Sequence, residues 1–302
     1  MSEAPPPRCP VCSDTNPRQR YQITRFQILE CPGCAQIYLY PLPSPEEIQE
    51  MFAQLYTTGD GSVPELKSYY GFCYDDEPGN PLVQLYESWL AEIEKHRRPG
   101  TILDVGCGTG LFLSAARRRG WEPFGIDDSE EATSYARDHF GLDLWVGDFA
   151  DFSSEGRKFD VITGWDIIEH AREPVQLLEA MRRSLAPGGF IGLSTPNQKS
   201  ILDVLAGSFY HLTAGRFTAP LEKFYIEQHF LYFTPQTLDQ ALRLADLEVV
   251  EMKREVTDLR RLTLSPFMRM ALQSLFMVAR GLGLENRLFT IAKAPEDSVR
   301  TS

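Results

Sequence analysis

The stretch ILDVGCGTG (residues 102–110) decides the fold, because an apolar run ends there in a turn with three glycines. A strand that ends in a glycine-rich turn and leads into a helix is typical of nucleotide-binding α/β proteins, including those that bind NAD or FAD. Here the glycines are spaced G-x-G-x-G, and Asp104 stands two residues before Gly106. A carboxylate at that place disfavours a pyrophosphate and suits a cationic ligand.

Further acids follow the next two expected strands. Asp127 in GIDDS lies about 20 residues beyond the loop, where a carboxylate binds both hydroxyls of a ribose. Asp148 and Phe149 in GDF offer a carboxylate to an adenine amino group and a ring to its face. For Asp128 and Ser129 we expect a loop or helix-cap role. Together the acids favour a nucleoside with a cationic tail.

From Thr101 onward, short apolar runs alternate with helical patterns. This alternation predicts an α/β fold with a mostly parallel sheet covered by helices on both faces. Strands are expected at 101–106, 122–127, 142–148, 159–167, 189–195, 247–256 and 287–293. Helices are expected at 110–119, 129–139 and 174–185. Residues 98–302 are therefore expected to form one Rossmann-like domain.

Several motifs, in order, resemble those of the class I S-adenosylmethionine-dependent methyltransferases over roughly residues 99–295. They are LDVGCGTG (103–110), GIDDS (125–129), GDF (147–149), FDVITGWDIIEH (159–170) and LAPGGFIGLSTPN (185–197). The resemblance implies a seven-stranded sheet with an antiparallel last strand, S-adenosylmethionine as methyl donor and S-adenosylhomocysteine as product. It implies that Asp104 faces the methionine ammonium, that Asp127 binds the ribose, and that Asp148 with Phe149 holds the adenine. The other cofactor residues that it implies are Gly106, Cys107, Gly108, Gly110 and Trp165.

The stretch GWDIIEH (164–170) ends the fourth strand, beside which the family binds its acceptor. Its Asp166, Glu169 and His170 resemble the corresponding stretch of ubiquinone-pathway O-methyltransferases, where such a set is associated with divalent-metal dependence. Oxygen and nitrogen ligands suit Mg²⁺, Mn²⁺ or Zn²⁺. The alternatives are His170 as a general base, His229 as that base, or a simple helix start. We favour a functional His170 and rank metal binding below that.

Two CxxC pairs predict a metal site near the N-terminus. Four cysteine thiolates in this spacing are typical of a structural zinc ribbon, expected over residues 1–45, and they leave no coordination position for catalysis. The ligands are Cys9, Cys12, Cys31 and Cys34. Ser13 and Ala35 follow the second cysteines, where ribbons often carry glycine. The segment holds four arginines and three acids, too little positive charge for a phosphate-binding footprint.

Three other segments surround the expected domain. Residues 46–97 are expected to form a helical, aromatic-rich linker or cap, with a helix beginning after Ser44. Residues 197–233 are aromatic and too long for an ordinary connection, so we expect a substrate lid. Residues 265–280 form an expected helix that is apolar on most faces. We favour its burial or a homodimer contact over docking on an anionic membrane surface.

Composition limits the partners. The net charge of −12 disfavours nucleic acid. No apolar signal region and no run long enough to span a bilayer are evident, so we expect a cytoplasmic protein.

The leading hypothesis is methylation of a small molecule at oxygen. A sugar or nucleotide-sugar methyltransferase, which the family includes among its zinc-ribbon members, is the second. RNA methylation and a non-catalytic binding role rank lower.

Overall fold

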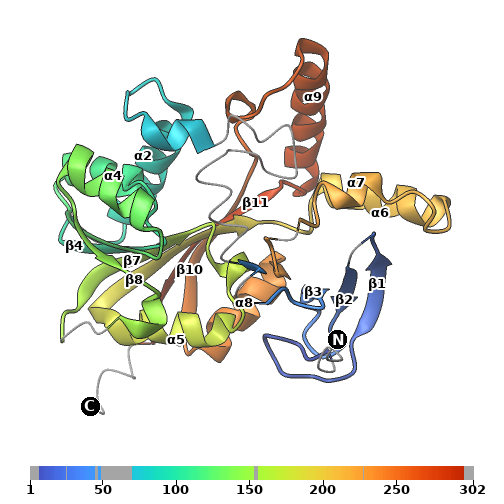
Figure 1. Ribbon diagram of the computed structural model, residues 1–302, viewed down its shortest axis with the longest axis horizontal. Coiled ribbons are helices and arrows are strands. Elements are labelled where there is room, and N and C mark those ends of the chain that lie inside the picture. The colour runs from blue at the N-terminus through green and yellow to red at the C-terminus, as the bar shows by residue number, and fades with distance from the viewer. Residues whose placement is uncertain are drawn as a thin grey trace.

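The computed structural model describes residues 7–24, 26–44, 47–48, 70–152, 156–226 and 228–295. Its centre is a seven-stranded sheet in the order β10-β11-β8-β7-β4-β5-β6 (Figure 1). The strands are β4 (Thr101–Val105), β5 (Glu122–Asp127), β6 (Asp143–Val146), β7 (Phe159–Trp165), β8 (Leu185–Pro196), β10 (Glu248–Glu255) and β11 (Arg287–Lys293). Only β11 runs against its neighbours, β8 and β10. The expected sheet with an antiparallel last strand is confirmed.

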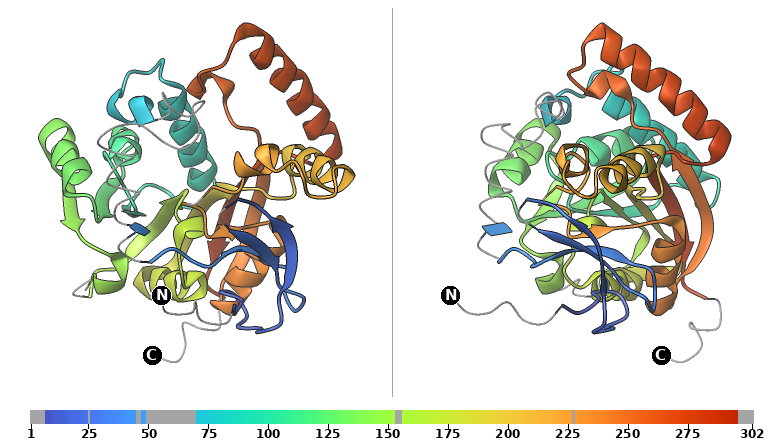
Figure 2. Two further views of the ribbon diagram at one scale, coloured as in Figure 1. Left: turned by 45° about the vertical axis from the view of Figure 1, so that its right-hand side comes forward. Right: turned by 90° about the vertical axis from the view of Figure 1, so that its right-hand side faces the viewer.

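Helices cover both faces of this sheet (Figures 1 and 2). One face carries α2 (Pro81–Glu94), α3 (Leu111–Arg118) and α4 (Glu130–Phe140), and the other carries α5 (Pro174–Ser184) and α8 (Pro235–Leu244). Neighbouring residues of a strand lie in different hydrophobic cores on the two faces of the sheet. Ile102 packs with α2 and α3, while Leu103 packs with α5 and α8. Because both sheet faces are covered, the central strands β4 and β7 are buried along nearly their whole length, whereas the edge strand β10 carries charged, partly exposed residues.

The helices begin where the sequence supplies caps. Ser129 accepts a hydrogen bond from the amide of Ala132 at the start of α4, which confirms its expected cap role. Thr234 and Thr237 form a capping box at the start of α8. Of the helix expected after Ser44, only Glu47 and Ile48 lie within the described residues.

A second, antiparallel sheet combines the N-terminal segment with the 197–233 insert. Its order is β1 (Arg18–Gln22), β2 (Gln27–Glu30), β3 (Ile37–Tyr40) and β9 (Leu231–Tyr232). The last pairing places Ile37 opposite Tyr232 and Tyr38 opposite Leu231. The insert also contains α6 (Ile201–Leu212) and the short α7 (Ala219–Glu222). The expected ribbon and the expected lid are thus joined by backbone hydrogen bonds.

Helix α9 (Pro266–Leu282) extends away from the central sheet (Figures 1 and 2). Only Phe276 and Ala279 are buried in it, whereas Phe267 is 75% exposed and Met277 is 65% exposed. The expectation that its apolar faces pack within the chain is therefore wrong, since the described residues leave most of them uncovered. Among those residues, no helix has the length and hydropathy needed to cross a bilayer.

Candidate functional site

The glycine loop between β4 and α3 adopts backbone conformations that favour glycine. Gly106, Gly108 and Gly110 have φ angles of 72°, 50° and 76°. A Cβ atom on Gly106 would lie 2.0 Å from Cδ1 of Ile167, so a side chain there would displace Ile167 and would also strain the left-handed backbone. The loop is thereby held against the residues that follow β7.

Asp127 ties this loop to the end of β5. Its Oδ2 accepts a hydrogen bond from the amide of Gly108 at 2.7 Å, and its Oδ1 accepts one from the amide of Ser129 at 2.9 Å. Burial raises the pKa of this carboxyl to about 6. The acid therefore lies where the sequence predicted, in contact with the loop that would hold the rest of the nucleoside.

Asp104 lies fully buried below the loop. It accepts a hydrogen bond from the hydroxyl of Thr163 at 2.6 Å. Burial raises its pKa to about 7, in spite of that hydrogen bond. Two buried acids with raised pKa values form a site that a cationic ligand would stabilise, which fits the methionine part of S-adenosylmethionine.

The other expected cofactor residues lie in different surroundings. Asp148 is exposed and accepts a hydrogen bond from the amide of Ala150 at 2.8 Å. Phe149 is buried, with its ring stacked near Phe152. Trp165 packs with other aromatic rings on the α2 face, and its Nε1 finds no hydrogen-bond partner among the described residues. Cys107 is buried in the same core. Their roles toward the cofactor stay predictions.

Asp166 pairs with Arg287 rather than with its two expected partners. Its Oδ1 accepts hydrogen bonds from Nη2 of Arg287 at 2.5 Å and from the hydroxyl of Ser194 at 3.0 Å. Burial raises the pKa of Asp166, but Arg287, together with Arg261 and the Ser194 hydroxyl, outweighs burial and lowers it. Sequence reasoning missed Arg287. The available signal was its position at the start of the last strand, where the carboxyl edge of the sheet lies.

Glu169, His170 and His229 form a compact cluster. One ligand atom from each lies within 4.8 Å of the others. Glu169 Oε2 accepts a hydrogen bond from the hydroxyl of Thr195 at 2.9 Å, while Oε1 is buried without a partner in the described part of the chain. The rings of the two histidines lie 4.9 Å apart. The structure thus unites the two histidines that the sequence offered as alternatives.

Burial disfavours the charged form of each member of this cluster. It raises the pKa of Glu169 to about 8 and lowers that of His229 to about 3. The pKa of His170 is lowered by the same cause. Nδ1 of His170 lies 2.5 Å from the carbonyl oxygen of Gln228 and donates to it, so Nε2 is its basic nitrogen. One carboxylate and two imidazoles are a donor set that suits a divalent cation.

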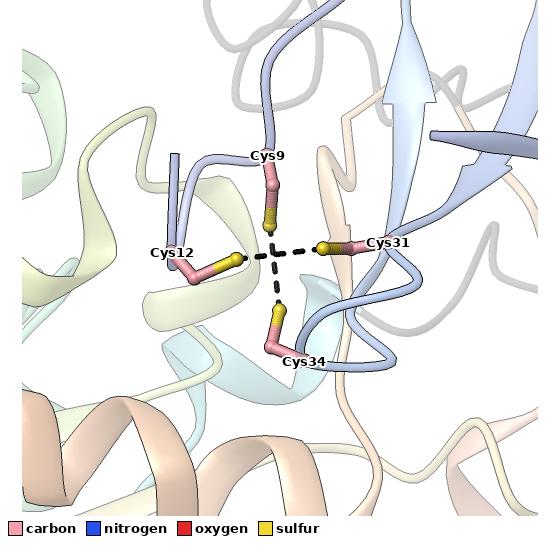
Figure 3. Close-up of side chains that lie close together, drawn as sticks. All are labelled: Cys9, Cys12, Cys31 and Cys34. Atoms are coloured by element: carbon pink, nitrogen blue, oxygen red, sulfur yellow. Dashed lines mark hydrogen bonds between the residues drawn. The ribbon is translucent and has the colours of Figure 1, made fainter. Parts of the chain in front are cut away.

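The four N-terminal cysteines converge from two similar turns (Figure 3). Sγ of Cys9 lies 3.5 Å from that of Cys34, and Sγ of Cys12 lies 3.4 Å from that of Cys31. Four sulfurs around zinc at ~2.3 Å are separated by about 3.8 Å, so only a small outward shift is needed. The donor set therefore fits a structural zinc ion.

The turns explain the residues that follow the second cysteines. Ser13 and Ala35 both have positive φ angles, 66° and 60°. Their amides donate to the carbonyls of Cys9 and Cys31 at 2.9 and 2.8 Å. The left-handed positions at which ribbons often carry glycine are thus present, occupied here by small side chains.

The sheet order, the glycine loop and the acid at the end of β5 define the class I S-adenosylmethionine-dependent methyltransferases. A family model described as "Methyltransferase domain" matches residues 82–252, and the chain belongs to this family. It is 34% identical over 173 residues to a ubiquinone biosynthesis O-methyltransferase of Hahella chejuensis, covering 53% of this chain and 68% of that protein. A protein of the same name from Alkalilimnicola ehrlichii is 35% identical over 164 residues, covering 50% of this chain and 62% of that one.

Solved structures share the fold at low identity. The plantazolicin methyltransferase in complex with S-adenosylhomocysteine gives a TM-score of 0.52 at 21% identity, covering 83% of this chain and 98% of that one. Magnesium protoporphyrin IX methyltransferase from Synechocystis gives 0.51 at 15% identity, covering 82% and 94%. These similarities establish the fold of the domain and say nothing of the acceptor.

Proposed function

We propose that this protein transfers a methyl group from S-adenosylmethionine to a hydroxyl of a small molecule. The observation that carries the proposal is the cluster of Glu169, His170 and His229 at the carboxyl edge of the sheet, just beyond β7. Ligands of open α/β sheets bind at this edge. The similarity to ubiquinone biosynthesis O-methyltransferases supports oxygen as the acceptor atom.

The binding of the cofactor follows from the loop and its acids. Bound S-adenosylmethionine supplies a methyl group on a sulfonium, which is already activated for displacement. Asp127 would bind the ribose, and Asp104 would face the ammonium once it has lost its proton. The glycines allow close approach of the backbone to the methionine part. The protein's remaining task is to align the hydroxyl and to remove its proton.

The acid–histidine cluster is suited to that task. A histidine with a pKa of about 3, as at His229, is a poor proton acceptor near neutral pH. Its burial beside Glu169 instead favours a role as a metal ligand, together with His170. A divalent ion held by these three residues would lower the pKa of an acceptor hydroxyl and orient it. Without an ion, Nε2 of His170 is the proton acceptor that the geometry favours.

A sugar acceptor is the second candidate. The resemblance stated above includes zinc-ribbon members that methylate sugars. In this protein the ribbon shares a sheet with the insert beside the cluster, through the pairing of β3 with β9. The ribbon is therefore part of the surroundings of the acceptor site rather than a separate appendage.

Product analysis tests the proposal. The full chain is incubated with S-adenosylmethionine carrying a ¹³C-methyl group and, separately, with catechol, 3,4-dihydroxybenzoate, a nucleoside diphosphate sugar or a short RNA. We expect a methoxy carbon signal with a diol acceptor, enhanced by Mg²⁺ or Mn²⁺. Label on carbon, or on RNA alone, would contradict the proposal. Label on the sugar would favour the second candidate.

A further inference from the structure

A cleft of about 750 Å³ lies between α2, α9 and the short helix η5 (Leu259–Arg261). Glu255 at the carboxyl end of β10 and Arg287 at the start of β11 form its floor. Because β11 is antiparallel to its neighbours, its first residue lies at the same edge as the carboxyl ends of β7 and β8. The cleft therefore opens on the edge at which the proposed methyl transfer occurs, and its volume suits an organic small molecule.

Positive charge dominates the walls of this cleft. Five arginines line it, against the two acids Glu255 and Asp258. The arginines are Arg260, Arg261, Arg269, Arg280 and Arg287. A protein of net charge −12 has no general excess of cations, so this concentration is local. Arginine is the side chain best suited to bind carboxylate and phosphate groups, through paired N–H donors.

The two acids in the cleft are too few to balance its five arginines, even with Asp166, which pairs with Arg287. Asp258 pairs with Arg260 through several hydrogen bonds. Glu255 accepts a hydrogen bond from Nε1 of Trp89, and burial raises the pKa of its carboxyl. Arg269 donates to the carbonyls of Leu259 and Leu262. In the described ranges, neither Arg269 nor Arg280 lies within ion-pair distance of a carboxylate.

Arg287 connects the cleft with the site beyond β7. It lines the cleft and also donates to Asp166, three residues before Glu169. Apolar side chains complete the walls, among them Leu85, Phe276 and Met277. A ligand here would place an anionic group against the arginines and an apolar part against α2 and α9.

We propose that this cleft binds the anionic group, a phosphate or a carboxylate, of the methyl acceptor. The acceptor is thus an organic anion with an apolar part, and its anion is held apart from the hydroxyl that is methylated. This inference rests on the proposed function, because it takes the ligand of the cleft to be part of the molecule that is methylated.

Calorimetric titration of the full chain with simple anions tests the inference without knowledge of the acceptor. The probes are inorganic pyrophosphate and benzoate at low ionic strength, with S-adenosylmethionine titrated in parallel. The variants are Arg280→Gln, and Arg269→Gln combined with Arg280→Gln. The control is Arg117→Gln, an exposed arginine on α3 outside the cleft.

We expect saturable binding of at least one anion, weakened about tenfold by Arg280→Gln and unchanged by Arg117→Gln. Preference for pyrophosphate assigns a phosphate-bearing acceptor, and preference for benzoate assigns a carboxylate. Binding of S-adenosylmethionine without binding of either anion would overturn the inference and leave the proposed function standing. Equal weakening by Arg117→Gln would also overturn it, since the effect would then be one of overall charge. Failure to bind S-adenosylmethionine would count against the proposed function instead.

Discussion

The amide of Phe230 donates a hydrogen bond to the carbonyl oxygen of Glu169 at 2.8 Å. The carbonyl oxygen of the same Phe230 accepts one from the amide of Leu39, in β3, at 2.9 Å. One residue thus joins the acid of the candidate site to the N-terminal sheet, and it directly follows His229 in the chain. We therefore expect the position of His229 in the cluster to depend on the ribbon.

Loss of the zinc ion that we predict for the four cysteines should loosen this connection. In Cys34→Ala, we expect loss of one zinc ion per chain and faster amide hydrogen exchange at residues 228–232. The thiolate cage is incomplete, and β3 then no longer holds β9. Exchange in α3 and the affinity for S-adenosylmethionine should not change. Cys73→Ala is the matched control, since Cys73 lies outside the four-cysteine cluster. Unaltered exchange at Phe230 after loss of zinc would show that the ribbon does not position His229.

Asp127 should dominate cofactor affinity. Its carboxylate accepts two backbone hydrogen bonds that close the loop, and the resemblance assigns it the ribose. In Asp127→Asn, the dissociation constant for S-adenosylmethionine should rise about 30-fold, the effect of losing charge-assisted hydrogen bonds. Asp128→Asn, an exposed neighbour, should leave it within about twofold. Equal effects of the two substitutions, measured by calorimetry, would refute the assignment.

The stability that Asp127 and Asp104 contribute in the absence of ligand should fall as pH rises from about 4 to about 7. Burial raises the pKa of Asp127 to about 6 and that of Asp104 to about 7, both from 3.8. Such a carboxyl stabilises the fold fully below its unfolded pKa, and this contribution is lost as pH rises through the folded pKa. A cationic ligand acts in the opposite direction, so the thermal shift produced by S-adenosylmethionine should grow with pH. Asp104→Asn should flatten that growth, and a wild-type shift independent of pH would contradict the prediction.

The metal content of variants should distinguish two possible sets of ligands for a second divalent ion. The sequence predicts Asp166, Glu169 and His170, whereas the structure brings together Glu169, His170 and His229. Glu169→Gln and His229→Ala should each abolish binding of a second divalent ion, whereas Asp166→Asn should retain it. Asp166→Asn should instead cost about 2 kcal/mol of stability, because it leaves the buried Arg287 without its anion. We place this value below that of a fully buried pair because the Asp166 side chain is 33% exposed. Loss of the second ion from folded Asp166→Asn protein, measured by mass spectrometry, would instead support the set of Asp166, Glu169 and His170.

Local patterns in the sequence were sufficient for the central sheet and the cofactor loop. The apolar runs, the glycines at 106, 108 and 110 and the cap at Ser129 each act within a few residues, so their structural meaning is local. The strand β9 has two residues and therefore no periodicity to detect. The ion pair of Arg287 with Asp166 joins residues 121 positions apart, and the sequence around either residue does not indicate its partner.

Helix α9 shows a different limit. Its start is a local signal, because Ser265 caps the helix and Pro266 follows at the first helical position. Its apolar composition also predicted burial, which the structure contradicts. The apolar composition of a helix indicates that burying its surface would be favourable. It does not indicate whether the same chain, a second copy or a membrane covers that surface. A homodimer contact and a membrane contact both remain predictions for this helix.

The most direct test of the central claim is the rate of S-adenosylhomocysteine formation with a diol acceptor in wild type, Glu169→Gln, His229→Ala and Arg117→Gln, with cofactor affinity measured in each. We predict a fall of about 100-fold in Glu169→Gln and His229→Ala, at unchanged affinity for S-adenosylmethionine, and wild-type rates in Arg117→Gln. Wild-type rates in both cluster variants would show that Glu169 and His229 take no part in methyl transfer.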